Sequence, residues 1–206
     1  MSASTFADLR SAFTFDDDAL RYRSAATGRF VSDRAVKQAI NTLIDRAQRE
    51  MSVLAALVAN GTLDVGQFQD RFAAELKNLH LATAAAGKGG WDRMKAADFG
   101  RVGAELRFQY ERLELFVRHI EAGDLSPRQI TARADLYIAA ANGTFEKTRR
   151  ADATEVKTQE RNILGVGEHC GDCLAMTRLG WVEVGALIPI GERICRGNCL
   201  CSYEFR

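Results

Sequence analysis

The sequence predicts a mainly α-helical protein, an antiparallel helical bundle or array followed by a small C-terminal β-hairpin module. The chain has only two prolines and long stretches rich in Ala, Leu, Arg and Glu, which favour helix. All five cysteines lie in the last thirty-seven residues, where glycine becomes frequent and helical periodicity ends. We therefore divide the chain into an N-terminal arm (1–32), a helical body (33–162) and a cysteine-rich, zinc-knuckle-like module (163–206).

Length and charge limit the classes of protein to which this chain can belong. With 206 residues it is long enough for one ordinary domain and a small appendage. Its 28 basic and 27 acidic residues give a net charge of +1, unlike the strongly basic balance of a dedicated nucleic-acid-binding protein. We find no signal peptide and no run of 18 or more apolar residues, so we expect a protein made and kept in a reducing cytosol.

The predicted arm mixes charged and apolar residues without a clear period. In the simpler interpretation it is partly disordered unless it docks on something. In the alternative interpretation it docks on a neighbouring subunit and uses Tyr22, Phe30 and Val31 as apolar anchors.

The first two helices are predicted from their caps and apolar stripes. The first begins at Ser32 or Asp33 and ends near Gly61, and the second begins at Asp64. The stripes are Ile40, Leu43, Ile44, Ala47, Met51, Leu54 and Val58 in the first helix, and Val65, Phe68, Phe72, Leu76 and Leu79 in the second. The second stripe fades into a glycine-rich stretch at 87–90, which we interpret as a flexible connection between helices.

Two further helices complete the predicted body. One spans about 91–122, and the next starts at Ser126 and Pro127, where a capping residue precedes a proline at the first helical position. An Asn-Gly pair at 142–143 predicts a kink or break in this fourth helix. The polar residues 146–161 have helical composition but almost no apolar stripe, so we expect an exposed helix or connector there.

The C-terminal module has the pattern of short strands between turns. Residues 180–185 and 199–205 alternate apolar and polar side chains, which is typical of a small β-hairpin. We expect Trp181 to form the small core of this module; the alternative is an anchor for a partner protein.

The cysteine spacing predicts a structural zinc site. Cys170 and Cys173 form a Cys-x-x-Cys turn, which places two thiolates on one ion, and the returning chain offers three more thiols. The predicted ligands are Cys170, Cys173, Cys195 and Cys199, with Cys201 as the possible substitute. His169 is an alternative nitrogen ligand because it adjoins the cluster in sequence. A tail with few large apolar groups needs such an ion in place of a core.

Other interpretations of the five thiols are less well supported. Two disulfides and a free thiol would require an oxidising compartment. A thioredoxin-like redox role would require a βαβ pattern around the Cys-x-x-Cys turn, and none is present. A module that binds nucleic acid would normally be basic, whereas residues 165–206 contain four basic and five acidic residues.

No catalytic constellation is evident, so we do not predict an enzyme. The three histidines, His80, His119 and His169, are widely separated, and catalytic zinc usually has an open coordination position and a neighbouring base. We expect His80 and His119 to lie in helices, with a hydrogen-bonded structural role for His119.

The C-terminal half resembles a known family. Its features are Glu160-Arg161, His169-Cys170-x-x-Cys173, Gly180-Trp181, a turn at Pro189-Ile190-Gly191, and a terminal Cys-x3-Cys-x-Cys from Cys195 to Cys201. This arrangement is similar to the minor head proteins of tailed bacteriophages, the Mu-F-like head-morphogenesis family, over about residues 90–206. The chain departs from that pattern in two places: Cys195 lies one position outside the usual histidine, and Leu200 replaces an arginine.

The resemblance implies a virion structural protein that acts in head assembly. It implies a place near the portal, the neck or the shell, in several copies or as a homo-oligomer, with portal, capsid or neck subunits as partners. It also implies production in the host cytoplasm and a possible contact with packaged DNA, without a membrane role. The alternative is a cytosolic, zinc-stabilised module that binds nucleic acid or regulates another protein.

Overall fold

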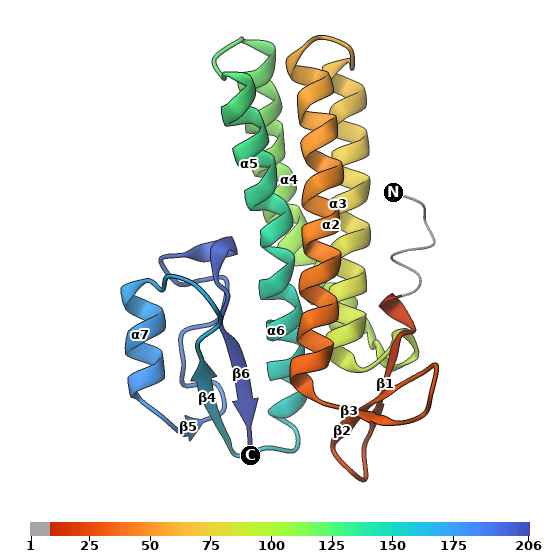
Figure 1. Cartoon of the computed structure of the whole chain (residues 1–206), viewed down its shortest axis with the longest axis vertical. Coiled ribbons are helices and arrows are strands. Elements are labelled where there is room, and N and C mark those ends of the chain that lie inside the picture. Colours follow the sequence, from red (N-terminus) through yellow and green to blue (C-terminus); the bar gives the residue numbers. More distant parts are fainter. Residues whose placement is uncertain (1–8) are drawn as a thin grey trace.

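The computed structural model describes residues 9–206 and shows an elongated helical bundle with one sheet at its base and a module on its side (Figure 1). The rods are α2 (Asp33–Ala59), α3 (Val65–Lys88), α4 (Ala96–Glu121) and, end to end, α5 (Pro127–Ala139) with α6 (Ala141–Ala153). A short 3-10 helix, η1 (Trp91–Arg93), links α3 to α4. The predicted mainly helical fold is confirmed.

Two small antiparallel sheets flank the bundle. The N-terminal sheet has the order β1-β2-β3, formed by β1 (Phe13–Asp16), β2 (Arg21–Ser24) and β3 (Phe30–Val31). The module contains β4 (Gln159–Ile163), α7 (Gly171–Arg178), β5 (Val182–Glu183), the 3-10 helix η2 (Arg196–Asn198) and β6 (Ser202–Phe205). Its sheet has the order β5-β4-β6, so β4 is central and the unit is larger than a simple hairpin. Residues 159–162, assigned above to the helical body, therefore lie in the module.

Three predicted helix starts are confirmed by their capping bonds, whereas the helix expected from about 91 begins at Ala96. The Ser32 side chain accepts a hydrogen bond from the backbone N–H of Ala35, and Asp64 does the same for Gln67. Ser126 and Gln129 form a full capping box. Each cap satisfies a backbone donor that the first helical turn leaves unpaired.

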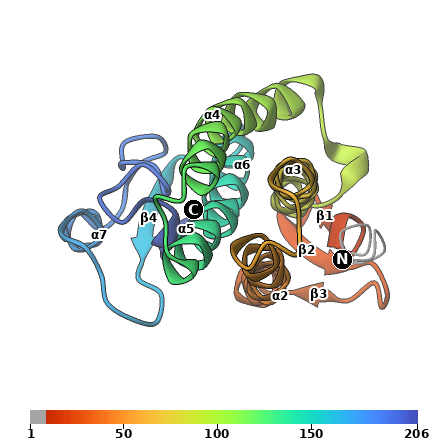
Figure 2. The same ribbon diagram turned by 90° about the horizontal axis from the view of Figure 1, so that it is seen from above.

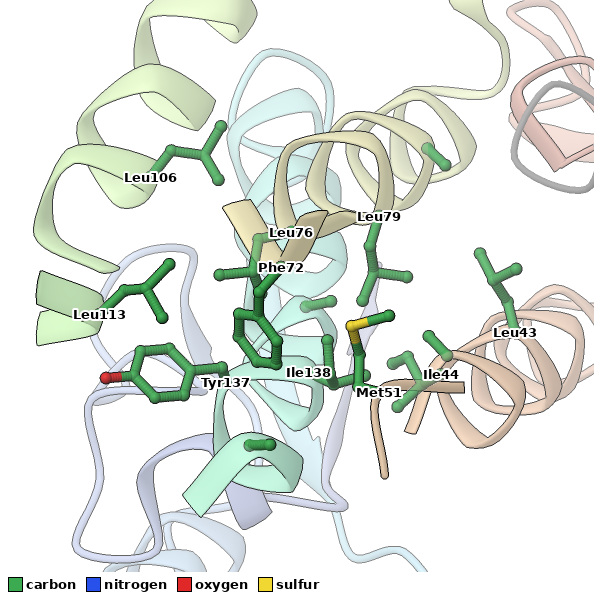
Figure 3. Close-up of a cluster of buried hydrophobic side chains, with 14 of the residues drawn as sticks. Leu43, Ile44, Met51, Phe72, Leu76, Leu79, Leu106, Leu113, Tyr137 and Ile138 are labelled. Atoms are coloured by element: carbon green, nitrogen blue, oxygen red, sulfur yellow. The ribbon is translucent and has the colours of Figure 1, made fainter. Parts of the chain in front are cut away.

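The predicted stripes meet in one continuous core. α3 presents Phe72, Leu76 and Leu79 to side chains of α2, α4 and α5 (Figure 3), and all three are fully buried. Phe72 packs edge-on against Tyr137, with ring centroids 5.7 Å apart. Viewed from the end, α3 lies beside α2, and α4 leans across toward α5 and α6 (Figure 2). Burial of these apolar side chains is the main driving force for the helical assembly.

The C-terminal end of α3 is not a flexible connection, so that prediction is wrong. Residues 82–90 are all buried. A Cβ atom on Gly87 would lie 2.8 Å from the backbone oxygen of Phe145, so only glycine allows α3 and α6 to come this close. The adjacent Lys88 is also buried, and its Nζ lies 2.6 Å from an Asp152 carboxylate oxygen.

Most of the predicted arm is a folded sheet that packs on the same chain. Tyr22 is only 3 % exposed, and its hydroxyl donates a hydrogen bond of 2.7 Å to the backbone oxygen of Gly87. Tyr22 is therefore not available to a neighbouring subunit, and that part of the prediction is wrong. Val31 packs against the same core, whereas Phe30 remains exposed beneath the guanidinium of Arg23. The predicted arm also includes residues 1–8, which lie outside the described part of the chain.

The fourth rod breaks near the predicted Asn-Gly pair. α5 ends at Ala139 and α6 begins at Ala141, and Gly143 lies close to the module, where a Cβ would be 3.3 Å from the backbone oxygen of Ile190. The predicted exposed helix or connector over 146–161 is wrong for its helical part, because Glu146 and Arg149 are 0 % and 6 % exposed. The module covers this polar face of α6. The turn at 154–156 is exposed, as expected of a connector.

The charged face of α6 pairs with the outer edge of β6. A Glu146 carboxylate oxygen accepts a 3.3 Å hydrogen bond from the backbone N–H of Tyr203, and Arg149 donates to the Tyr203 backbone oxygen. Farther along α6, Arg150 forms a buried ion pair with Glu160 of β4. These charges bond to backbone groups that a neighbouring strand would otherwise satisfy, so α6 completes the sheet.

Trp181 is not the core of the module, which corrects another prediction. Its ring lies between the guanidinium groups of Arg161 and Arg206, at 4.7 and 4.4 Å from the ring centroid. The buried cluster of the module consists instead of Cys173, Leu187, Ile190, Cys199, Cys201 and Tyr203. Sulfur atoms thus form much of this core.

His80 has a structural environment inside the bundle. Its Nε2 lies 3.0 Å from the Gln109 amide nitrogen and must accept from it, so Nδ1 donates to the Thr144 hydroxyl at 2.7 Å. Burial lowers the pKa of His80 to about 4, so the ring is neutral at pH 7. His119 is largely exposed, and its Nδ1 lies 3.3 Å from a carboxylate oxygen of Asp124.

Replacing Gly87 with alanine tests the close contact of α3 and α6. The added methyl group must displace the Phe145 backbone, so we expect Gly87→Ala to lower the free energy of unfolding by about 1–3 kcal/mol. Gly103, a glycine in α4 whose Cβ would meet nothing within 4 Å, is the matched control. Gly103→Ala should raise the free energy of unfolding by about 0.4–1 kcal/mol. Equal effects of the two substitutions in urea unfolding would contradict the packing described.

Candidate metal centre

The module brings the cysteine side chains together from three segments of the chain. Cys170 is the N-cap of α7 and Cys173 lies in its first turn. Cys195 and Cys199 flank η2, and Cys201 immediately precedes β6. The helical turn and the η2 loop thus face each other, and each contributes sulfur atoms to one cluster.

The sulfur atoms form two overlapping sets that could hold a metal ion. One set is Cys170, Cys173 and Cys195, and the other is Cys173, Cys199 and Cys201, with all sulfurs of a set within 4.8 Å of one another. Cys173 belongs to both. Its Sγ lies 3.5 Å from the Sγ of Cys170 and 3.6 Å from those of Cys195 and Cys199.

These distances fit tetrahedral thiolate coordination better than disulfide bonding. Four sulfurs at about 2.3 Å from a central ion are about 3.8 Å apart, close to the 3.5–3.6 Å between Cys173 and its three neighbours. The four predicted ligands belong to two different sets, so an ion bound by all four would draw Cys199 toward Cys170 and Cys195. A disulfide requires about 2.05 Å. All five cysteines are free thiols in this structure, so the arrangement of two disulfides and one free thiol does not occur in it.

The η2 loop is seated on the break between α5 and α6. A Cβ on Gly197 would lie 3.0 Å from the backbone oxygen of Leu136 and 3.2 Å from the nitrogen of Ala140. The preceding Arg196 has φ of 46°, a left-handed conformation that is uncommon for a residue with a side chain. The side chain of Asn142 donates a 2.6 Å hydrogen bond to the Cys199 backbone oxygen. These contacts fix the loop that bears Cys195 and Cys199.

The thiols differ in how readily they ionise. Burial opposes ionisation of Cys170, but backbone hydrogen bonds from Cys173 and Cys195 outweigh it and lower its pKa to about 7. Burial, with hydrogen bonds to Cys170 and Cys173, raises the pKa of Cys195 to about 12. A hydrogen bond to Cys199 and burial raise the pKa of Cys201. A bound cation would favour the thiolate of every sulfur that it contacts.

A buried arginine provides positive charge beside the cluster. Arg193 is 1 % exposed, and its guanidinium lies 3.8 Å from the Cys173 sulfur and 2.8 Å from the Asn162 side-chain oxygen. Within residues 9–206 it forms no ion pair with a carboxylate. A buried charge needs an opposite charge, and thiolates are the available one. Neutral thiols or disulfides would leave this guanidinium uncompensated.

His169 lies outside both sulfur sets. Its Nε2 is 3.1 Å from the backbone oxygen of Gly165 and must donate to it, so this nitrogen is not available to a metal. The structure thus brings together all five cysteines named from the sequence but not the alternative nitrogen ligand. Sequence patterns gave no indication of Arg193, Asn162 or Asn142, because their proximity to the sulfurs arises only from the tertiary fold.

Fold and site together define a mainly helical protein whose C-terminal module contains a cysteine cluster that could hold a metal ion. Comparisons of the chain with protein-family models, with curated proteins and with solved structures found no match. Over residues 9–206, none of the helices combines the length and the apolar character that crossing a membrane requires.

Replacing Arg193 tests its electrostatic role. In Arg193→Met the side chain keeps much of its apolar volume but loses the charge, so we expect metal affinity to fall by roughly 10–100-fold, as for other residues that contact metal ligands. The exposed Arg178 of α7 supplies the control, Arg178→Met. Affinity is measured by competition with a chromophoric chelator. The same affinity in both variants would show that the buried charge does not support the thiolates.

Proposed function

We propose that the chain is a structural protein of a tailed-phage particle, a minor head or portal-proximal protein that acts in head assembly. In this proposal a structural zinc ion, ligated by cysteine, holds the C-terminal module in shape. The protein is not an enzyme, is made in the host cytoplasm and becomes part of the virion. Its partners are portal, capsid or neck subunits, with several copies in each particle.

The closed cysteine cluster is the observation that carries the structural role. Cys173, Cys199 and Cys201 are at most 2 % exposed, and the cluster sits among apolar side chains of the module. Structural zinc sites are closed, four-coordinate and rich in thiolate, whereas catalytic sites keep a position for water or substrate. Soft thiolate ligands also favour zinc over magnesium, calcium or manganese.

The module is positioned to stabilise the helical body. Asn142 of α6 donates to the backbone of Cys199 and lies against Lys37 of α2, so one amide connects the cluster to two helices. A zinc ion that orders the η2 loop would therefore also fix the junction of α5 and α6. Such coupling suits a subunit whose task is to keep a defined shape within a larger assembly.

Exposed apolar side chains support contacts with other proteins. Examples are Phe108 and Leu115, seven positions apart on α4, and Val166 and Ile194 on the module; others lie on α2 and α5. Large apolar side chains that gather on a surface commonly mark protein interfaces. The resemblance of the cysteine pattern to phage minor head proteins supplies the kind of assembly. The module contains four basic and five acidic residues from 165 to 206, which favours protein partners over nucleic acid.

The particle itself tests the proposed location. When this chain is made together with the rest of its phage, mass spectrometry of particles purified by two density gradients and nuclease treatment should detect it. Its ratio to the portal protein should be constant between preparations. Recovery of the chain only in the unsedimented fraction, with portal and capsid proteins in the particles, would refute the proposal.

Metal removal tests the structural zinc. Protein purified without added metal should contain about one zinc per chain by elemental analysis, since one tetrahedral site takes one ion. After chelation, hydrogen exchange should become faster in β4, β6 and α6, while the amides in the core of α3 keep their protection. Each kcal/mol by which zinc removal lowers the free energy of unfolding should lower the Tm by roughly 2–4 °C in a domain of this size. Unchanged Tm and exchange after complete zinc removal would contradict a structural ion.

A further inference from the structure

The cluster contains one sulfur more than a tetrahedral ion needs. Five thiols converge, and the two sets that could hold a metal share only Cys173. The first set contains Cys170 and Cys195, which we call the outer thiols, and both are partly exposed. The second contains Cys199 and Cys201, which we call the inner thiols, and both are buried. The surplus sulfur is therefore not a surface residue placed near the site by chance.

Cys201 has the position and reach of a ligand. Cys201 immediately precedes β6 and is fully buried, as is its neighbour in the cluster, Cys173. The Sγ of Cys201 lies within 4.8 Å of the sulfurs of both Cys173 and Cys199. Two ligands of one ion are about 3.8 Å apart, so a shift of about 1 Å would bring Cys201 into the coordination shell.

We propose that Cys201 is a reserve ligand, which enters the coordination shell when an outer thiol is lost. In the intact site the ion is held by Cys170, Cys173, Cys195 and Cys199, and Cys201 stays beside Cys199 outside the coordination shell. When Cys195 is absent, the ion moves toward the inner thiols and takes Cys201 as its fourth ligand. Cys173 has no such replacement because both sets need it. This inference rests on the proposed metal site and adds to it a tolerance to loss of the accessible sulfurs.

A simpler role for Cys201 makes a different prediction. If Cys201 only donates a hydrogen bond to a ligand, replacing it lowers zinc affinity by the same factor whether or not Cys195 is present. If Cys201 is a reserve ligand, the loss of zinc affinity is small in the intact site and large once Cys195 is missing. The two roles therefore differ in whether the two substitutions have additive effects.

Four variants of the full chain separate these roles: Cys195→Ser, Cys201→Ser, the double variant and Cys173→Ser. Zinc affinity is measured for each by competition with a chromophoric chelator. We expect each of the first two to weaken binding by no more than roughly 100-fold, the range for residues around a metal site. In the double variant, zinc affinity should fall by a much larger factor than the product of the two single-variant factors. Cys173→Ser alone should lower zinc affinity as strongly as the double variant does. Additive effects would overturn the proposal.

Cobalt provides a second readout that does not depend on the double variant remaining folded. The sulfur-to-cobalt charge-transfer absorption grows with the number of bound thiolates. Cys195→Ser loaded with Co²⁺ should keep the absorption of the wild type, because Cys201 replaces the missing sulfur. Absorption reduced to about three-quarters would mean a shell of three thiolates and no replacement, which would overturn the proposal.

Two controls keep the outcomes distinct. Ser202→Ala, combined with Cys195→Ser, changes the residue next to Cys201 without removing a thiol and should leave zinc affinity close to that of Cys195→Ser alone. A wild-type chain that binds neither zinc nor cobalt would refute the proposed metal site itself. A wild-type chain that binds both ions, combined with additive substitutions, would refute only the reserve role of Cys201.

Discussion

The pairing of the polar face of α6 with the edge of β6 is the contact on which the two halves of the molecule depend. Glu146 and Arg149 are buried, and both bond to the backbone of Tyr203. Their charges are paired with each other and with Lys37 and Asp33 of α2, and the module adds hydrogen bonds that these buried groups still need. The module is equally dependent, because α6 satisfies the open edge of its sheet. The helical body and the module therefore stabilise each other across this contact.

This dependence explains which parts of the fold the sequence could predict. Helix caps such as Ser32, Asp64 and Ser126 bond to residues three positions away, so they are visible in the local sequence. An apolar stripe predicts a buried helix face whichever element covers it. The helices α2 to α5 were therefore predictable. The burial of α6 was not, because its polar face is satisfied by residues about 57 positions away. The same reason applies to Tyr22, whose hydrogen-bond acceptor lies 65 positions away. A polar sequence predicts exposure, but in both cases specific tertiary partners bury the polar residues.

In the cysteine cluster, too, some features were predictable from nearby residues and others depend on distant ones. The Cys-x-x-Cys turn and the later thiols were evident from spacing, and the structure brings all five together. The sequence could not separate the partly exposed from the buried sulfurs, since that distinction depends on how the η2 loop lies against α5. Nor could it identify Arg193, whose guanidinium faces Cys173 from twenty positions away. The charge that makes thiolates favourable here is thus a product of the tertiary fold.

The bridge made by Asn142 has a consequence for the order in which the protein folds during synthesis. One side of its amide lies against Lys37 and the other holds Cys199, residues from opposite ends of the chain. A ribosome releases the N-terminal residues first, so α2 and α3, which are consecutive in the sequence, can associate before the later helices appear. The junction between α5 and α6 must wait until the cysteines have left the exit tunnel. The final shape of the fourth rod is therefore set only after the segment that carries Cys199 has been synthesised.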